Sequence, residues 1–317
     1  MRGSGLTLAD TAPPHHLPSS MNTTSPLFDS GLVRHRIGRA RAGGYAGFLL
    51  ERVADDLEDR LAAVTRAFPL GLDFGTPLPA LAERLRRSGR VERMIRLSPV
   101  SEPGPSLVGD PEFLPFGATA GFDLAVSALA LQHVNDLPGT LIQARRALKA
   151  DGLLVACLLG GASLTELRQA FLQAESEKEG GASPRVAPFA ELRDLGGLMQ
   201  RAGFALPVVD ADTITVRYGD PFALMRDLRA MGLTNALTDR RRTPLRRRTL
   251  LRAAEIYAER FSDPDGRLRA TFEILWLSGW VPHESQQKPL RPGSAKARLT
   301  DALGTAEQTL PHRGDES

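Results

Sequence analysis

The sequence predicts an α/β fold in which a mostly parallel, doubly wound sheet is covered by helices on both faces. Strongly apolar runs occur at 69–75, 122–131 and 153–159, and they have the length and composition of buried strands. Segments at 78–88 and 136–149 lie between these runs and carry apolar residues at helical spacing. Because parallel strands are buried on both faces and are joined through helices, this alternation is typical of a doubly wound sheet.

The first half of the chain fits this pattern element by element. An amphipathic helix is expected over 45–66, where Leu49, Val53 and Leu57 recur every four residues. The strand after it ends in an acid and a glycine. A weaker strand at 93–97 is ended by a proline, and the turn before 153–159 is Asp-Gly, which favours chain reversal.

The second half is predicted to be more helical. Two short strands at 204–210 and 213–218, separated by a turn around Ala211 and Asp212, predict a hairpin. A hairpin added to a parallel sheet would make the sheet mixed. The last expected element, 271–282, contains both tryptophans, which we expect to pack in the core. Helices are expected at 163–178, 188–201, 220–231 and 247–261.

Length and composition exclude several classes of protein. The 317 residues allow one elaborated domain or two modest ones, and a formal charge of +3 gives no reason to expect nucleic-acid binding. No apolar run is long enough to span a bilayer, so no membrane span is expected. A single cysteine, Cys157, excludes a disulfide framework and a cysteine-based zinc site, and it suits a reducing compartment. No metal site is expected.

The two ends of the chain are polar and are predicted to be disordered tails, at 1–25 and 286–317. The first of them lacks the apolar core of a signal peptide and is not an arginine-rich transit peptide. Met21 opens a more ordinary beginning, so translation from Met1 and from Met21 are both open.

The loop after the first strand is the first candidate ligand site, because doubly wound sheets bind ligands beyond the carboxyl ends of their strands. Asp73, Gly75 and Thr76 stand there, followed by Pro77 and Pro79. A nucleotide-binding turn needs small residues with free amides, whereas each proline removes a donor and adds a ring. An ordinary strand-to-helix loop remains an equal alternative.

The position after the second strand is Ser98, where a carboxylate would be expected to bind both hydroxyls of a ribose. A hydroxyl cannot give that bidentate interaction, and Glu102 comes late in the loop. Asp110 and Glu112 precede the next strand and could accept a bond from an adenine amino group. A turn in which they face water is the alternative.

Ser127, His133 and an arginine run complete the candidate residues. Ser127 and His133 follow the fourth strand, and His133 is a candidate general base, although no partner for it can be recognised. The run 240–248 could attract an acidic surface, anionic lipid or RNA. It lacks the interleaved aromatic residues of base stacking, so a solvated loop between helices is the alternative.

Several segments, read in order, resemble one family: LFDSGLVRHR, FPLGLDFG, GDPEFLPF, FDLAVSALALQHVNDLPGTLIQARRALKADG, ESEKEGGASPRVAPF, DLGGLMQRAGF and GWVPHESQQKP. They resemble the class I S-adenosylmethionine-dependent methyltransferase superfamily. More narrowly, they resemble the branch that contains the respiratory complex I assembly factor 5 proteins, related to the biotin-pathway malonyl-carrier methyltransferases. The resemblance runs from about Pro26 to Pro289, and its most specific pieces are 175–181 and 283–286.

The resemblance implies a Rossmann-like, seven-stranded mixed sheet with extra helices in the C-terminal half. It implies one domain over 26–285, with a core at 66–160 and a helical and hairpin elaboration at 161–285. S-adenosylmethionine would lie over the first two strands, where Pro77, Pro79 and Ser98 replace expected binding residues. The implied cofactor contacts are Asp73, Gly75, Thr76, Asp110, Glu112, Ser127, Ala128 and Leu129.

Two functions follow from the resemblance. The first is an S-adenosylmethionine-dependent enzyme that methylates a protein side chain, or hydroxylates an arginine, on a subunit of respiratory complex I. The second is a cofactor-free pseudoenzyme that acts as an assembly or scaffolding factor. Either would work in the cytoplasm, including the surface of the inner membrane, or in the mitochondrial matrix of a eukaryote. In both cases the partner is a protein and no nucleic acid is expected.

Overall fold

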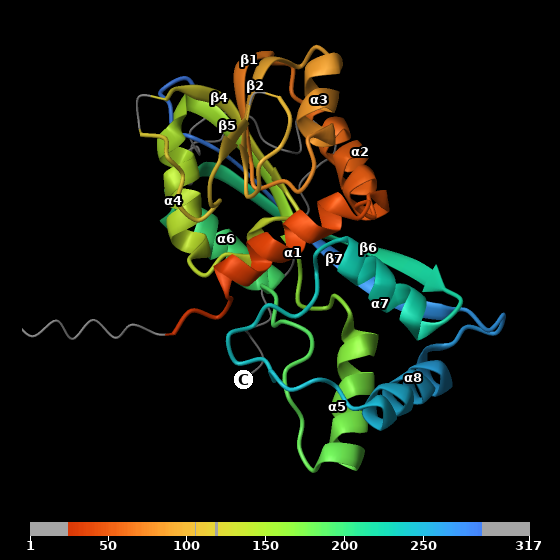
Figure 1. Cartoon of the computed structure of the whole chain (residues 1–317). Coiled ribbons are helices and arrows are strands. Elements are labelled where there is room, and N and C mark those ends of the chain that lie inside the picture. The colour runs from red at the N-terminus through yellow and green to blue at the C-terminus, as the bar shows by residue number, and fades with distance from the viewer. Residues whose placement is uncertain (1–24, 105, 118–119, 287–317) are drawn as a thin grey trace, which may run out of the picture.

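The computed structural model describes residues 25–104, 106–117 and 120–286 (Figure 1). One seven-stranded sheet forms its centre, in the order β3-β2-β1-β4-β5-β7-β6. Strands β1 to β5 are parallel to one another, and β7 runs antiparallel to both β5 and β6. The predicted seven-stranded mixed sheet is therefore confirmed. The strands are β1 Phe68–Phe74, β2 Val91–Ser98, β3 Ser106–Val108, β4 Phe122–Ala128, β5 Leu148–Leu159, β6 Ala205–Tyr218 and β7 Leu268–Trp280.

Helices lie on both sides of the sheet, as the alternating pattern predicts. In Figure 1, α2 and α3 lie on one side and α4 and α6 on the other, while α5 and α8 pack together in a protrusion below the sheet. The helices are α1 Ser30–Ala42, α2 Phe48–Ala62, α3 Ala80–Arg87, α4 Leu137–Ala147, α5 Thr165–Glu179, α6 Leu192–Arg201, α7 Pro221–Ala230 and α8 Arg247–Phe261, with a 3₁₀ turn η1 at Leu131–His133.

The core consists of two apolar layers, one on each face of the sheet. All seven residues of β4 are buried, and they divide between the two layers. Leu124 and Val126 pack in a cluster with the apolar faces of α2 and α3. Ala125 packs in a second cluster with α4 and α6. The side-chain alternation of a strand therefore explains why an unbroken apolar run is needed here.

The hairpin predicted at 204–210 and 213–218 is wrong. Strand β6 continues through the expected turn and pairs with β7 at Asp210, Ala211 and Asp212 without interruption. The expected turn around Ala211 and Asp212 has no glycine or proline that would favour reversal. Arg60 of α2 binds both neighbouring aspartates, at 2.8 Å from Asp210 and 3.3 Å from Asp212. The antiparallel pairing instead comes from β7, which lies between β5 and β6.

Two elements were not foreseen from the residue pattern. Helix α1 buries only Ile37 and Ala40, so its apolar stripe is too thin to be recognised, although Asp29 caps it by accepting a bond from the Leu32 amide at 3.0 Å. Strand β3 is three residues long and pairs only with β2. Both elements border the candidate site described below.

Most of both predicted tails lies outside the described residues. Gln286, the first residue of the second one, donates from its amide nitrogen to Asp151 Oδ1 at 2.9 Å and to the Val281 carbonyl at 2.8 Å. None of the helices in the described ranges is long and apolar enough to cross a membrane.

Candidate functional site

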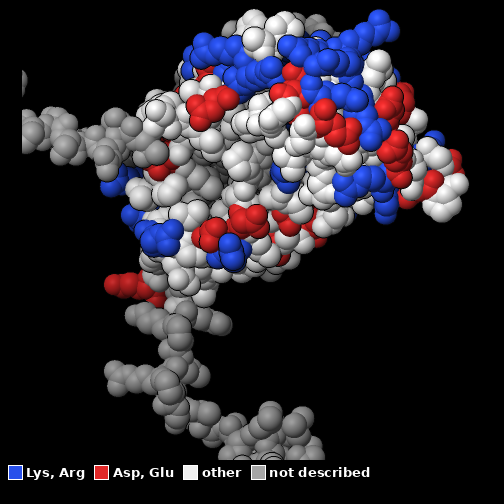
Figure 2. Space-filling model, turned by 90° about the horizontal axis from the view of Figure 1, so that it is seen from below, with Lys and Arg blue, Asp and Glu red and all other residues white. Residues whose placement is uncertain are grey.

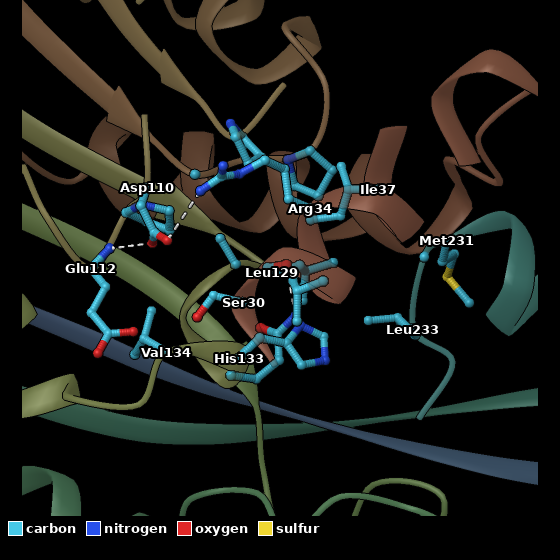
Figure 3. Close-up of a pocket in the computed structure, with 18 residues that line it drawn as sticks. Ser30, Arg34, Ile37, Asp110, Glu112, Leu129, His133, Val134, Met231 and Leu233 are labelled. Carbon is cyan, nitrogen blue, oxygen red and sulfur yellow. Dashed lines mark hydrogen bonds and ion pairs between the residues drawn. The ribbon is translucent and has the colours of Figure 1, made fainter. Parts of the chain in front are cut away.

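The candidate site lies at the edge of the sheet where β1, β2, β4 and β5 end. Because these strands are parallel, their carboxyl ends meet at one edge, and residues of α1 cover it (Figure 1). A cavity between α1 and the loops after β1, β4 and α7 has a volume of only about 40 Å³ (Figure 3). A buried water occupies roughly 10–15 Å³ by the same measure, so this space holds a few water molecules.

Asp73, at the end of β1, is fully buried and is bound by an arginine of the neighbouring strand. Arg96 Nη1 donates to Asp73 Oδ2, and Arg96 Nη2 donates to the Thr76 carbonyl at 3.1 Å. Burial raises the pKa of Asp73 to about 6, against the opposing effect of the Arg96 charge. Asp73 Oδ1 has no hydrogen-bond partner among the described residues. One oxygen of the carboxylate therefore binds a protein cation, and the other is left without a partner in the described structure.

Glu102 closes the other side of Arg96. Its carboxylate accepts from Arg96 Nε at 2.7 Å and from Arg41 Nη2 at 2.9 Å, and only 2% of its side chain is exposed. Burial acts to raise the pKa of Glu102, but the hydrogen bonds and charges of Arg96 and Arg41 outweigh it and lower that pKa. Arg41 of α1 also donates to Ser98 Oγ at 3.1 Å. Asp73, Arg96, Glu102, Arg41 and Ser98 thus form one connected network, the β1–β2 ion cluster.

The loop after β1 is packed against protein atoms. Gly75 has φ +80°, and a Cβ built there would lie 2.9 Å from Ala130 Cβ and 3.0 Å from Pro111 Cβ. Thr76 is buried, and its hydroxyl oxygen accepts from the Ala128 amide at 3.0 Å. Pro77 is buried as well and lines the small cavity. The close approach that Gly75 permits is therefore made to the chain itself.

Asp110 and Glu112 bind their own surroundings. Arg34 of α1 lies 3.6 Å from Asp110 Oδ2, and the Asp110 Oδ1 accepts from the Glu112 amide at 3.0 Å (Figure 3). The Glu112 carboxylate accepts from the amides of Asn135 and Asp136 at 2.9 and 3.0 Å, which joins the loop before β4 to the start of α4. Of the two acids, Asp110 alone keeps part of its carboxylate exposed, at 21% of the side chain.

Residues 127–129, at the end of β4, are buried. Ser127 and Ala128 are fully buried, and Ser127 Oγ has no partner among the described residues. Leu129 has φ +52°, and its amide donates to the Cys157 carbonyl at 2.9 Å. Its side chain lines the small cavity opposite α1 (Figure 3).

His133 lies between two cavities. Its ring meets the Phe28 ring edge to face, with centroids 5.4 Å apart, and in Figure 3 it points toward Leu233. Burial, together with the charge of Arg36, lowers the pKa of His133 to about 4. At neutral pH the imidazole is therefore uncharged and weakly basic, which is a poor match for a general base that works near pH 7.

A second, larger cavity adjoins the first and shares His133 and Leu233 with it. Its volume is about 600 Å³, within the range of roughly 300–1,000 Å³ that is common for ligand sites. It lies between α5, α7 and the segment that follows α7. In the part of the chain that the structure describes, no group of three or more His, Cys, Asp or Glu side chains could hold a metal ion.

Comparison with known proteins identifies the family. The family described as "Methyltransferase domain" matches residues 45–207, about half of the chain. This chain belongs to the class I S-adenosylmethionine-dependent methyltransferases. The strand order, with an antiparallel β7 between β5 and β6, is the topology of that superfamily. The match begins at the N-terminal end of α2 and ends early in β6, so α7, α8 and β7 lie beyond it.

Relatives that match most of this chain show which branch of the superfamily it is similar to. "Arginine-hydroxylase NDUFAF5, mitochondrial" of Danio rerio is 40% identical over 265 residues, which cover 80% of this chain and 81% of the relative. The Homo sapiens protein of the same name is 40% identical over 309 residues, or 92% and 89% of the two chains. "Malonyl-[acyl-carrier protein] O-methyltransferase" of Laribacter hongkongensis is 37% identical and covers 84% of this chain and 94% of the relative. The predicted resemblance is confirmed.

The residues at the family's cofactor position do not fit S-adenosylmethionine. The superfamily's turn after β1 carries an acid followed by several glycines, whereas here Asp73 is bound by Arg96, Pro77 and Pro79 follow Gly75, and a Cβ at Gly75 would meet Pro111 and Ala130. Ser98 cannot hold a ribose diol, and Glu102 is already bound by two arginines. The cavity lined by Gly75, Asp110 and Leu129 has a volume of only about 40 Å³. The methyltransferase fold is therefore present without a matching cofactor site.

The β1–β2 ion cluster was missed by sequence reasoning. An arginine inside an apolar strand is the signal that could have revealed it, because arginine is almost never fully buried unless it is paired. Arg96 stands in RMIRLS, directly before the position expected to bind ribose. Arg41 could not have been placed, because α1 itself was not foreseen.

Proposed function

We propose that this chain is a cofactor-free member of the methyltransferase superfamily that binds a protein client during the assembly of respiratory complex I. One observation supports it above the others: Arg96 lies between Asp73 and Glu102, where the superfamily binds its cofactor. A scaffolding role needs the fold and a binding surface but not the methyl donor. It would be carried out in the cytoplasm at the inner membrane, or in the mitochondrial matrix, by a chain that visits the membrane without spanning it.

The relatives favour a protein client. Those named arginine-hydroxylase NDUFAF5 match nearly the whole chain, including the helices and strands beyond the matched domain. A second candidate function, modification of a protein side chain as that name describes, is favoured by the 40% identity. The lowered pKa of His133, about 4, and the small volume of the cavity at Gly75 and Asp110, about 40 Å³, speak against it.

The test is complementation in cells that lack the chain. Assembled complex I is measured by native electrophoresis and by NADH–quinone oxidoreductase activity. We expect both to fall without the chain and to return with the native chain and with Asp73→Asn, because Asp73 is bound by Arg96 and serves no ligand. If complex I is unchanged by the loss, the assembly role is wrong. If Asp73→Asn accumulates as a folded protein but does not restore activity, the cofactor-free reading is wrong.

A further inference from the structure

The 600 Å³ cavity has an apolar interior and an arginine rim, and this combination identifies a class of ligand. We propose that it binds an acidic segment of the protein client, with one bulky apolar side chain inside and carboxylates on the rim. The inference rests on the proposed function, because it names the chemistry of that client. It assigns the binding surface to the α5–α7 side of the sheet edge and not to the family's cofactor position.

The interior is apolar because two helices turn their core-facing residues toward it. Leu167 and Phe171 of α5 are buried at 6% and 7% exposure, and Leu228 of α7 at 5%. Val186 and Phe189 follow α5 and complete this side. A cavity of this size accepts a large aliphatic or aromatic side chain, whose burial supplies most of the binding free energy at such contacts.

The rim is basic without acidic residues. Six arginines line the cavity, and no Asp or Glu occurs among the described residues that do so: the arginines are Arg36, Arg185, Arg229, Arg240, Arg241 and Arg242. Three of them have carboxylate neighbours outside the cavity: Arg185 lies 2.5 Å from Glu175, Arg240 3.4 Å from Asp29 and Arg241 3.5 Å from Glu179.

The other three rim arginines leave an unbalanced positive charge. Arg36 donates to the Thr234 carbonyl at 2.5 Å, and no ion pair of Arg36, Arg229 or Arg242 is found within the described ranges. Burial lowers the pKa of Arg36, and the charges of Arg240 and Arg39 add to this effect. Figure 2 views the molecule from below and shows that Lys and Arg side chains are interspersed with Asp and Glu over this face.

This charge selects among possible clients. A client arginine would be repelled by the rim, so the substrate in the name of the NDUFAF5 relatives does not suit this cavity. A nucleic acid or a bilayer needs an extended basic surface, whereas these arginines surround a concave, apolar space. An acidic segment with one exposed apolar residue satisfies both the rim and the interior.

The test uses the full chain and a fluorescein-labelled peptide with a central Phe flanked by Glu residues. Fluorescence anisotropy is recorded at low and at physiological ionic strength. We expect saturable binding that weakens with salt, because exposed charges are screened within a Debye length of about 8–10 Å. The same peptide with Lys in place of Glu, or with Ala in place of Phe, is expected to bind at least about tenfold more weakly.

The matched protein variants reverse charges on and off the rim. Arg229→Glu/Arg242→Glu changes two exposed rim residues, and Arg146→Glu changes an exposed residue of α4 on the other side of the sheet. All three substitutions leave the core untouched, so thermal unfolding should be nearly unchanged. We expect at least about tenfold weaker peptide binding for the rim variant and native binding for Arg146→Glu.

Each outcome decides the inference separately from the proposed function. Binding that is absent, or that is equal in the rim variant and Arg146→Glu, overturns the acidic-client inference whatever the cofactor result. Tighter binding of a single-stranded RNA, or of vesicles with anionic lipid, in an Arg229- and Arg242-dependent manner would also overturn it. Cofactor binding by the native chain, together with rim-dependent peptide binding, would overturn the proposed function and leave this inference standing.

Discussion

Two cavities lie side by side at the same edge of the sheet, and they have opposite electrostatics. Beside β1 and β2, the charged groups of the β1–β2 ion cluster are buried and paired with one another. The nearby cavity lined by Gly75, Asp110 and Leu129 has a volume of about 40 Å³. Beside α5 and α7, six arginines surround about 600 Å³ without an acid among the described lining residues. The charges of the first region are paired with one another, whereas Arg36, Arg229 and Arg242 of the second have no ion pair among the described residues.

A fold can be retained while the residues at its ligand site change. The sheet order and both apolar layers remain those of a methyltransferase, because they depend on the alternation of buried side chains. The cofactor position of the superfamily depends on a few polar residues, and here Arg96 binds Asp73 and Arg41 binds Ser98. The larger cavity shares His133 and Leu233 with the smaller one.

The largest expected effect is a loss of folding stability when the β1–β2 ion cluster is broken. Arg96→Ala leaves Asp73 and Glu102 buried without their main cation, and removal of one partner from a buried pair costs about 3–5 kcal/mol. Arg93→Ala, at an exposed position of the same strand, is the control and should cost less than about 0.5 kcal/mol. Urea unfolding measures both. A loss below about 1 kcal/mol for Arg96→Ala would mean that the cluster does not hold the structure.

A pair of glycines separates backbone strain from packing. Gly75 and Gly89 have φ of +80° and +74°, but a Cβ at Gly75 meets Ala130 and Pro111, whereas nothing lies within 4 Å of one at Gly89. Gly75→Ala should therefore destabilise the chain by about 1–3 kcal/mol more than Gly89→Ala, which carries only the backbone strain. Equal losses in thermal or urea unfolding would contradict the close packing of the loop after β1.

The third expected effect is a pH dependence of the folding stability that comes from Asp73. Because the folded-state pKa of Asp73, about 6, lies above the ordinary value of 3.8 for an aspartate, the folded chain binds more protons between these pH values than the unfolded chain does. Stability from this group is therefore present at low pH and is lost as the pH rises from about 4 to about 6. Asp73→Asn removes this dependence, which is on the order of 1–3 kcal/mol over the window. The difference in unfolding free energy between the two chains, measured at several pH values, should change in this direction; a constant difference would contradict it.

Most of the fold could be predicted from the sequence, and the state of the site could not. Apolar runs such as 122–131 and 153–159 identify buried strands on their own, but Ala211 and Asp212 gave a false turn because their pairing with β7 is set by distant residues. Pro77 and Ser98 predict a damaged cofactor loop, and this stays a prediction until cofactor binding is measured. The contacts of Asp73 with Arg96 and of Ser98 with Arg41 of α1 could not be predicted, because they form only when segments far apart in the sequence fold together.

Calorimetric titration of the native chain with S-adenosylmethionine and its demethylated product measures whether this chain binds the cofactor of its superfamily. We predict no saturable heat at ligand concentrations up to about 1 mM, where the binding free energy would be only about −4 kcal/mol. Pro77→Gly/Pro79→Gly/Ser98→Asp should also stay silent, because Arg96 and Arg41 still fill the position. Saturable binding of either ligand by the native chain, with a dissociation constant below about 100 μM, would contradict this prediction.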